Sequence, residues 1–280
     1  SDDHLWFTET KMDRDSCRYH KQDLFSRGKV RKTSELRKDI LYKGKPKHYI
    51  PLVKEIQFTE TETKIDPYLM GILLGDGSFR TGCISYSNID KEIVESVNSL
   101  VPAGLSNNST GYSCDFRISG HKKGVRNPIV AEIKKLGLWQ LSSENKYIPD
   151  IYKFNSVENR ISILQGLMDT DGYVGKNGHS IEFSTISKTL AEDISFLSQS
   201  LGGTGKIISR YTHYTYNGIK KKGKLSYRVY IKLPTHISPF RLSRKLERYK
   251  PSTKYHAKRR IISINRVGIK ECKCISIDYK

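Results

Sequence analysis

The 280-residue sequence predicts an α+β fold built from two similar halves. A nonapeptide occurs twice in nearly the same form, as LMGILLGDG at 69–77 and as LQGLMDTDG at 164–172. A strand-like segment follows each copy at a matching offset, at 83–88 and at 180–185. A single apolar helix that ends in Asp-Gly is ordinary, but its repetition with the same continuation indicates two halves of common design.

Each nonapeptide ends an expected helix. Asp66 offers an N-cap ahead of a proline, and Ser156 can cap the second helix. Both helices carry small residues four positions apart, which lie on one face and let two helix backbones approach closely. These residues are Gly71 and Gly75 in the first helix and Gly166 and Thr170 in the second. We therefore expect the two helices to pack against each other.

That packing would place Asp76 and Asp171 side by side at the C-terminal ends of the helices. The negative end of a helix dipole disfavours an isolated anion and favours one that binds a cation. As a simple turn, Asp-Gly would need no cation, because Asp begins turns and Gly adopts positive φ. The occurrence of two copies favours a divalent metal at Asp76 and Asp171.

The remaining elements repeat in the same order. Amphipathic patterns predict helices at 91–101 and 189–201, and alternating patterns predict hairpins at 105–118 and 206–233. We expect the tip of the second hairpin at 217–222. In its first strand, alternation puts four residues on one face: Arg210, Thr212, Tyr214 and Tyr216. The pattern leaves open which face would meet a partner.

The two nonapeptides and their flanks resemble the LAGLIDADG homing endonucleases that carry both motifs on one chain. The resemblance implies two αββαββα halves related by pseudo-twofold symmetry, an antiparallel β-saddle over double-stranded DNA, and Mg²⁺ bound by Asp76 and Asp171 at the helix interface. It also implies the carbonyls of Gly75 and Thr170 as further metal ligands. The first motif departs from the family pattern at Leu74-Gly75, where Asp-Ala is expected, but its final Asp-Gly is intact.

A second match concerns lysines. The segment Glu144–Pro149 (ENKYIP) is similar to the lysine-x-Ile-Pro segment of the family, which implies that Lys146 is the active-site lysine of the first half. Its counterpart should lie a similar distance beyond Asp171, and Lys245 does. Lys232 is the alternative, although it fits a strand residue that faces DNA. Such lysines would polarise the attacking water or stabilise negative charge.

The chain is strongly basic, with 49 Lys and Arg against 29 Asp and Glu and a net charge of +20. The charge is uneven, since residues 204–280 carry a net +18 and residues 11–54 a net +9. Surfaces of one sign attract phosphate regardless of sequence and make binding steeply salt-dependent. The candidate DNA contacts are Arg80, Ser85, Arg117, Arg210, Thr212, Tyr214, Lys220, Lys221, Lys222, Arg228 and Lys232.

The two ends of the chain resemble a different family. Residues 1–8 are similar to the Thr-x-x-His block of intein splicing domains, with Ser1 and His4 matching, and residues 264–277 resemble a strand block near an intein's C-terminal end. We therefore expect small, mainly-β remnants of a splicing domain around the two halves. The four expected parts are a basic N-terminal flanking segment, the first half, the second half and a C-terminal strand segment, at 1–58, 59–155, 156–258 and 259–280.

The resemblance implies a site-specific endonuclease that uses Mg²⁺ to make a double-strand break with 3′ overhangs at a long recognition site. A non-cleaving DNA-binding regulator is one alternative, but it normally loses one or both terminal acids of the motifs. An RNA-splicing maturase of the same fold is another, and a pure interaction module has little support. Five cysteines without zinc spacing, and the absence of a signal peptide or transmembrane segment, predict an intracellular protein. We expect it to be a monomer.

Overall fold

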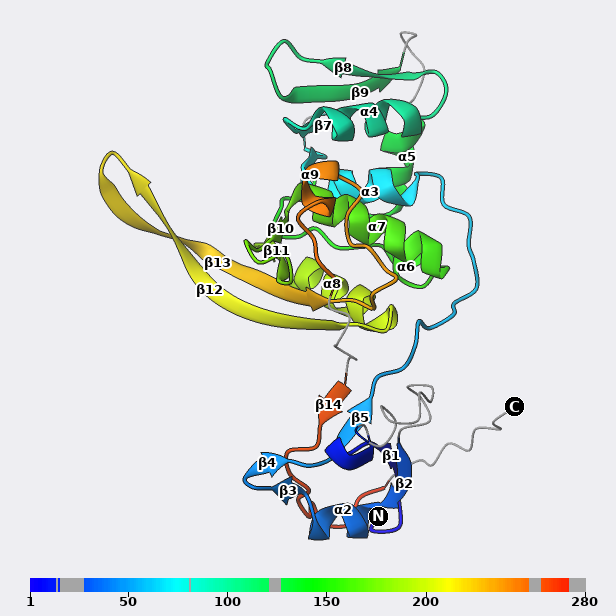
Figure 1. Cartoon of the computed structure of the whole chain (residues 1–280). Helices are drawn as coiled ribbons and strands as arrows, with labels where there is room; N and C mark the ends of the chain where they lie inside the picture. Colours follow the sequence, from blue (N-terminus) through cyan, green and yellow to red (C-terminus); the bar gives the residue numbers. More distant parts are fainter. Residues whose placement is uncertain (14, 16–27, 81, 121–126, 252–257, 272–280) are drawn as a thin grey trace. The chain divides into compact units, whose positions relative to one another are not determined.

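The computed structural model describes residues 1–13, 15, 28–80, 82–120, 127–251 and 258–271 (Figure 1). The chain divides into two compact units: Ser1–Leu52 together with Lys258–Lys280, here called the flanking unit, and Val53–Ala257, the central unit. Among the helices of the described residues, none combines the length and the apolar character needed to cross a membrane.

The flanking unit consists of short antiparallel strand pairs. They are β1 (Leu5–Thr8) with β2 (Lys29–Lys32), β3 (Leu41–Tyr42) with β4 (Lys45–Pro46), and β5 (Tyr49–Pro51) with β14 (Lys258–Arg260). The helix α2 (Thr33–Lys38) buries Leu36. The pairing of β5 with β14 joins segments from the two ends of the sequence.

The strand expected at 264–277 is not found in its described part. Residues 261–271 have no regular structure, and residues 272–277 lie outside the described residues. Val267 and Ile269 are exposed, so the apolar alternation there has no buried face to stabilise a strand. The C-terminal strand of the flanking unit is instead the more polar β14.

The described residues of the central unit repeat one order of elements: helix, two strands, helix, two strands, helix. The first series is α3 (Pro67–Gly75), β6 (Gly77–Ser78), β7 (Ile84–Ser87), α4 (Lys91–Leu100), β8 (Leu105–Ser109), β9 (Asp115–Gly120) and α5 (Pro128–Lys135). The second is α7 (Val157–Thr170), β10 (Gly172–Val174), β11 (Ile181–Thr185), α8 (Lys188–Ser200), β12 (Thr204–Tyr216), β13 (Ile219–Lys232) and α9 (Ser243–Leu246), with α6 (Asp150–Lys153) between the series. The sheets have equivalent strand orders, β6-β7-β9-β8 and β10-β11-β13-β12.

The helices α3 and α7 pack against each other at the centre of this unit (Figure 1). Their N-caps are the predicted ones, since Asp66 accepts hydrogen bonds from two N–H groups of α3 and Ser156 accepts one from α7. A Cβ atom on Gly71 would overlap the Gly166 backbone, and one on Gly75 would overlap the Thr170 side chain. The predicted close approach of the two small-residue faces is therefore confirmed.

Each sheet has a buried and an open face. Alternate residues such as Ile84, Ile118, Phe183 and Val229 are fully buried in the core. The residues between them point the other way, where Ser85 lies opposite Arg117 and Ser184 opposite Arg228. The open faces are thus polar and carry cations.

The second sheet extends into a long two-stranded ribbon, seen in yellow in Figure 1. Its turn is only Asn217-Gly218, both at positive φ, which is the geometry of a type I′ hairpin turn. The six-residue tip expected from the sequence was therefore too long, and the residues that follow Gly218 are already strand. A bulge interrupts the ribbon where Gly223 and Lys224 together face Thr212.

Candidate active site

Asp76 and Asp171 end the two central helices. Each is a C-cap residue whose N–H donates to the carbonyls of the preceding helical turn. The residues immediately before them, Gly75 and Thr170, are in direct contact between the helices. The structure therefore brings the two carboxylates to the same end of the helix pair.

The surroundings of the two carboxylates differ. The side-chain amide of Asn88 donates a hydrogen bond of 2.6 Å to Asp76 Oδ2, whereas within the described residues we find no hydrogen bond to the Asp171 carboxylate. Burial raises the pKa of Asp76, and the Asn88 hydrogen bond opposes that rise. Burial and the nearby Asp76 charge raise the pKa of Asp171 to about 6, although Lys146 and Lys245 act in the opposite direction. Both shifts indicate that a doubly ionised pair is unfavourable without a cation.

The raised pKa of Asp171 predicts an unusual dependence of stability on pH in metal-free protein. Between pH 4 and 6 the folded state keeps a proton that the unfolded state has lost, so the free energy of unfolding should fall as pH rises through this window. The burial that raises this pKa is incomplete, since water still reaches part of the Asp171 side chain. We therefore expect a loss of only roughly 1 kcal/mol. Urea unfolding in EDTA at pH 4.5 and 7.5 should show a smaller fall for Asp171→Asn than for the wild type. An equal fall in the free energy of unfolding for both proteins would contradict the raised pKa of Asp171.

Two buried lysines close the ends of the same helices. Lys146 Nζ donates to the carbonyls of Leu74 at 2.8 Å and Gly77 at 2.7 Å, and contacts those of Leu73 and Gly75 at 3.4 Å. Lys245 Nζ makes the equivalent set of contacts at α7, with the carbonyls of Met168 (2.8 Å), Asp169 (2.7 Å), Thr170 (3.1 Å) and Gly172 (2.7 Å). Each ammonium therefore satisfies carbonyls that a helix C-terminus leaves without partners.

Burial lowers the pKa of each of these lysines to about 8, against the attraction of Asp171 and Asp76 for Lys146 and of Asp169 for Lys245. Lys232, the alternative in the second half, is exposed on β13 and lies opposite Thr204. Lys245 thus occupies, relative to α7, the place that Lys146 occupies relative to α3.

The donors at this end of the helix pair fit a hard divalent cation. They are oxygens only: the carboxylates of Asp76 and Asp171 and the carbonyls of Gly75 and Thr170, which also face the lysines. No group of three or more His, Cys, Asp or Glu suited to a metal occurs among the described residues. Two carboxylates are nonetheless enough for Mg²⁺, which typically keeps several waters and completes its shell with substrate phosphates.

Sequence reasoning missed Asp169, the middle acid of the second motif. It is fully buried, and its Oδ2 accepts hydrogen bonds from the Tyr68 hydroxyl at 2.8 Å and from the N–H groups of Arg241 at 3.0 Å and Leu242 at 3.2 Å. These bonds hold the loop that leads to Lys245. The sequence did contain a signal for Asp169. The equivalent position in the first motif is the apolar Leu74, so the two motifs differ here in having an acid on one helix and none on the other.

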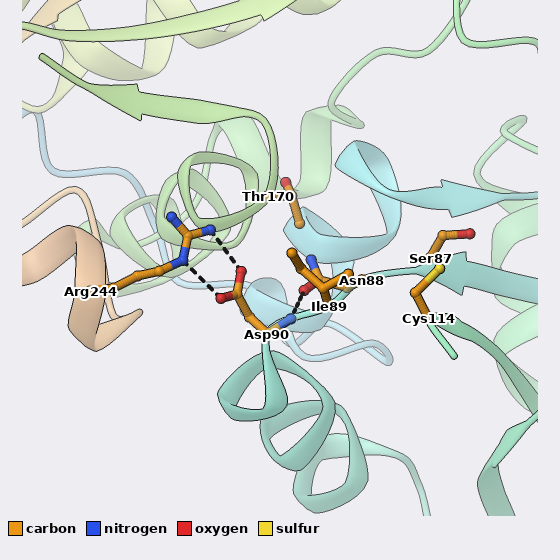
Figure 2. A pocket seen from close by; sticks show the side chains of 7 residues that line it. All are labelled: Ser87, Asn88, Ile89, Asp90, Cys114, Thr170 and Arg244. Atoms are coloured by element: carbon orange, nitrogen blue, oxygen red, sulfur yellow. Dashed lines mark hydrogen bonds and ion pairs between the residues drawn. The ribbon is translucent and has the colours of Figure 1, made fainter. Parts of the chain in front are cut away.

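Sequence reasoning also missed a pocket of about 250 Å³ beside the carboxylates, shown in Figure 2. It is lined by Ser87, Asn88, Ile89, Asp90, Cys114, Thr170 and Arg244. One wall thus carries the amide that binds Asp76, and another carries the residue before Asp171. Arg244 closes one side with a two-bond ion pair to Asp90, which holds the pKa of Asp90 below its usual value.

The candidate DNA contacts of the sheets lie on the open faces. Ser85 and Arg117 are neighbours on the first sheet. On the second sheet, register places Arg210, Arg228 and Lys232 on one face. Arg228 forms an ion pair of 3.0 Å with Glu182, which reduces the net charge at the middle of that sheet. Arg80 is exposed between β6 and β7.

The other candidates lie on the ribbon. The bulge shifts the alternation of β13, so that Lys221 lies with Tyr214 and Tyr216 while Lys222 lies on the opposite face with Tyr211. The ammonium groups stack accordingly, Lys221 over the Tyr216 ring at 4.8 Å and Lys222 over the Tyr211 ring at 3.5 Å. The Thr212 hydroxyl donates to the Lys224 carbonyl. The side chain of Lys220 lies outside the described part of the structure.

Residues 158–233, from the first turn of α7 to the end of β13, match the family model described as LAGLIDADG-like domain. Residues 158–233 of the chain thus form a LAGLIDADG-like domain. The matched segment contains the second LAGLIDADG motif, with Asp171 as its terminal acid.

Two curated proteins that are similar to this chain carry different names, a helicase and an endonuclease. The replicative DNA helicase DnaB of Mycobacterium intracellulare is 27% identical over 210 residues, which cover 71% of this chain and 31% of that protein. The homothallic switching endonuclease of Saccharomyces cerevisiae is 25% identical over 172 residues, covering 51% of this chain and 28% of that protein. The chain therefore spans less than a third of the length of these relatives. Among solved structures, the homing endonuclease I-DmoI in complex with DNA and Ca is 14% identical, with a TM-score of 0.39, covering 66% of this chain and 97% of that one.

Proposed function

We propose that this chain is a site-specific endonuclease that uses a divalent metal, Mg²⁺ in the cell, to cut both strands of DNA. The observation that carries the proposal is that one catalytic unit, a carboxylate and a buried lysine at the end of a helix, occurs twice. Asp76 and Lys146 at the end of α3 have equivalents in Asp171 and Lys245 at the end of α7. Two equivalent units at one helix interface suit a substrate with two equivalent scissile bonds, one in each strand.

The binding surface proposed for DNA is formed by the open faces of the two sheets and by the ribbon. A two-stranded ribbon fits the major groove, where Arg, Lys and Thr can reach base edges. The net charge of +20 supplies phosphate attraction that does not depend on sequence. Arg117, Arg210 and Lys221 are the side chains that best meet both requirements on this surface.

The chemistry proposed is hydrolysis of a phosphodiester, in which water adds to phosphorus and the 3′ oxygen leaves. When bound by Asp76 and Asp171, a divalent cation would supply a Lewis acid and neutralise charge at the phosphate. Lys146 and Lys245 stabilise the negative charge that builds up on the phosphate oxygens while they are protonated. With pKa values of about 8, they can also exchange protons with water close to neutral pH. Asn88 keeps the Asp76 carboxylate oriented.

The expected product is a double-strand break with short 3′ overhangs, because the two units would act on phosphates across a narrow minor groove. A non-cleaving regulator is less favoured because both terminal acids and both buried lysines are present. The name helicase does not transfer to this chain, since its sequence contains no G-x₄-G-K-[S/T] motif for the phosphates of ATP.

An origin within an intein is also proposed. It is supported by the resemblance of residues 1–8 and 264–277 to splicing-domain blocks. The pairing of β5 with β14 also supports it, because this pairing joins the N-terminal and C-terminal segments of the flanking unit. The limited overlap with the helicase relatives is compatible with an element inserted in a longer host protein.

Exchange of the metal ion tests the proposed activity. We expect cleavage of selected duplexes from a randomised library in Mg²⁺, binding without cleavage in Ca²⁺, and no cleavage in EDTA. The larger Ca²⁺ accepts the same oxygen ligands in a looser and more variable geometry. Strand-resolved sequencing of the cut ends gives the overhang. Equal turnover in EDTA would remove the metal from the mechanism.

A further inference from the structure

The two buried lysines are each held by the opposite half of the central unit. Lys146 belongs to a segment of residues 144–149 that ends the first half. Its carbonyl accepts a hydrogen bond of 2.6 Å from the hydroxyl of Ser187, the N-cap of α8. The carboxylate of Asp193, also on α8, accepts one of 2.8 Å from the N–H of Ile148. A helix of the second half thus anchors the lysine of the first.

The converse holds for the Lys245 segment, residues 241–246. Arg244 donates two hydrogen bonds, of 2.8 and 2.7 Å, to the carboxylate of Asp90, the N-cap of α4 (Figure 2). The N–H of Ser243 donates to Glu92 of the same helix at 3.0 Å. Asp90 therefore takes the place in the first half that Ser187 takes in the second, since each precedes the helix that follows the second strand.

We call the contacts of Ser187 and Asp193 with residues 144–149 the first anchor, and the pair of Arg244 with Asp90 the second anchor. The two anchors differ chemically. Ser187 and Asp193 are 0% and 7% exposed, so the first anchor consists of hydrogen bonds shielded from water. In the second, the side chains of Arg244 and Asp90 are 57% and 17% exposed. An ion pair that is open to solvent is weaker and easier to disturb than shielded hydrogen bonds.

The second anchor is also connected to the other carboxylate. The N–H of Asp90 donates to Asn88 Oδ1 at 2.8 Å, and the amide of Asn88 donates to Asp76 Oδ2 at 2.6 Å (Figure 2 shows the first of these bonds). In the second half, Thr185 accepts from the N–H of Ser187 in the same way, at 3.1 Å. Within the described residues, hydrogen bonds continue from Asp90 to a carboxylate of the candidate active site, and none does so from Ser187.

We propose that Arg244 and Asp90 are positioning residues that fix Lys245 independently of Lys146, so that the cutting of one DNA strand can be slowed without slowing the other. The proposal rests on the proposed function, because the substrate is taken to be duplex DNA. The ion pair touches no reacting atom and acts through the lysine that follows Arg244 in the chain.

The test compares the nicking of each strand in wild type, Arg244→Gln, Asp90→Asn and the exchange variant Asp90→Arg/Arg244→Asp. The substrate is a supercoiled plasmid that carries the selected target, and each strand is followed on denaturing gels. We expect one strand to be cut on the order of 10-fold more slowly in the single variants, as for a displaced catalytic group. The other strand should change little, nicked circles should accumulate, and the exchange variant should recover part of the loss.

Acetylation of lysines, followed by mass spectrometry without DNA, gives a readout that needs no activity. In Arg244→Gln and Asp90→Asn the labelling of Lys245 should increase several-fold relative to Lys146. Glu192→Gln, which removes the exposed Lys188–Glu192 pair on α8, is the matched control and should leave the ratio unchanged. Equal slowing of both strands, or an unchanged labelling ratio, overturns the proposal. If wild type cuts no duplex, the proposed function fails, and the labelling ratio alone decides the role of the ion pair.

Discussion

Asp76→Asn and Asp171→Asn should each reduce double-strand cleavage by on the order of 10³-fold, with little change in DNA affinity. Asparagine keeps the size of the side chain and the cap of the helix, but it removes the negative charge that a divalent cation requires. Affinity should survive, because most of it comes from phosphate contacts on the sheets and ribbon. Gel-based cleavage in Mg²⁺ and binding in Ca²⁺ measure the two quantities separately.

Asp150→Asn is the control for this pair of variants. Asp150 is an exposed carboxylate on α6 that pairs with Lys153, so its loss should leave cleavage unchanged. Full cleavage by either Asp76→Asn or Asp171→Asn would remove that carboxylate from the active site. A loss of DNA binding in parallel with cleavage would show that the variants act on the fold.

Lys146→Ala and Lys245→Ala should have the second-largest effect, a fall in cleavage rate of on the order of 10²-fold. Both should also lower the free energy of unfolding by roughly 1–3 kcal/mol, because each leaves buried carbonyls at a helix C-terminus without their donor. Lys232→Ala should mainly weaken DNA binding, since Lys232 is exposed on the open face of β13. Rates should be compared at a temperature where every variant is folded.

Added ethylammonium separates chemistry from folding in the lysine variants. A small amine can enter the space left by Lys→Ala and restore the charge, so cleavage by Lys146→Ala and Lys245→Ala should recover in part. Lys232→Ala should not respond. The reverse pattern, with rescue of Lys232→Ala and near-normal cleavage by Lys245→Ala, would move the second catalytic unit to β13.

The central helix pair could be predicted because its determinants are local. Residue type alone indicates where each helix begins and which face can approach another helix. The helix starts are marked by Asp66 and Ser156, and the close faces by Gly71 and Gly166. The repetition of the element order followed from hydrophobic periodicity, whose period differs between helices and strands.

The polar contacts around the site could not be predicted, because they depend on residues brought together only by folding. Asn88 reaches Asp76, and Asp90 reaches Arg244 across more than 150 positions, without a spacing that would reveal either. The ribbon shows a second limit. Alternation is reliable only until a bulge intervenes, and the bulge at Gly223 put Lys221 and Lys222 on faces that simple counting from Arg228 would exchange.

Binding of Mn²⁺, followed by electron paramagnetic resonance of the free ion, tests most directly whether the carboxylates of α3 and α7 form one metal site. The protein is titrated in complex with a duplex that it binds and cannot cut. We predict that wild type takes up Mn²⁺ and that both Asp76→Asn and Asp171→Asn lose most of this uptake, while Asp150→Asn keeps it. Equal uptake by all four proteins would contradict the site.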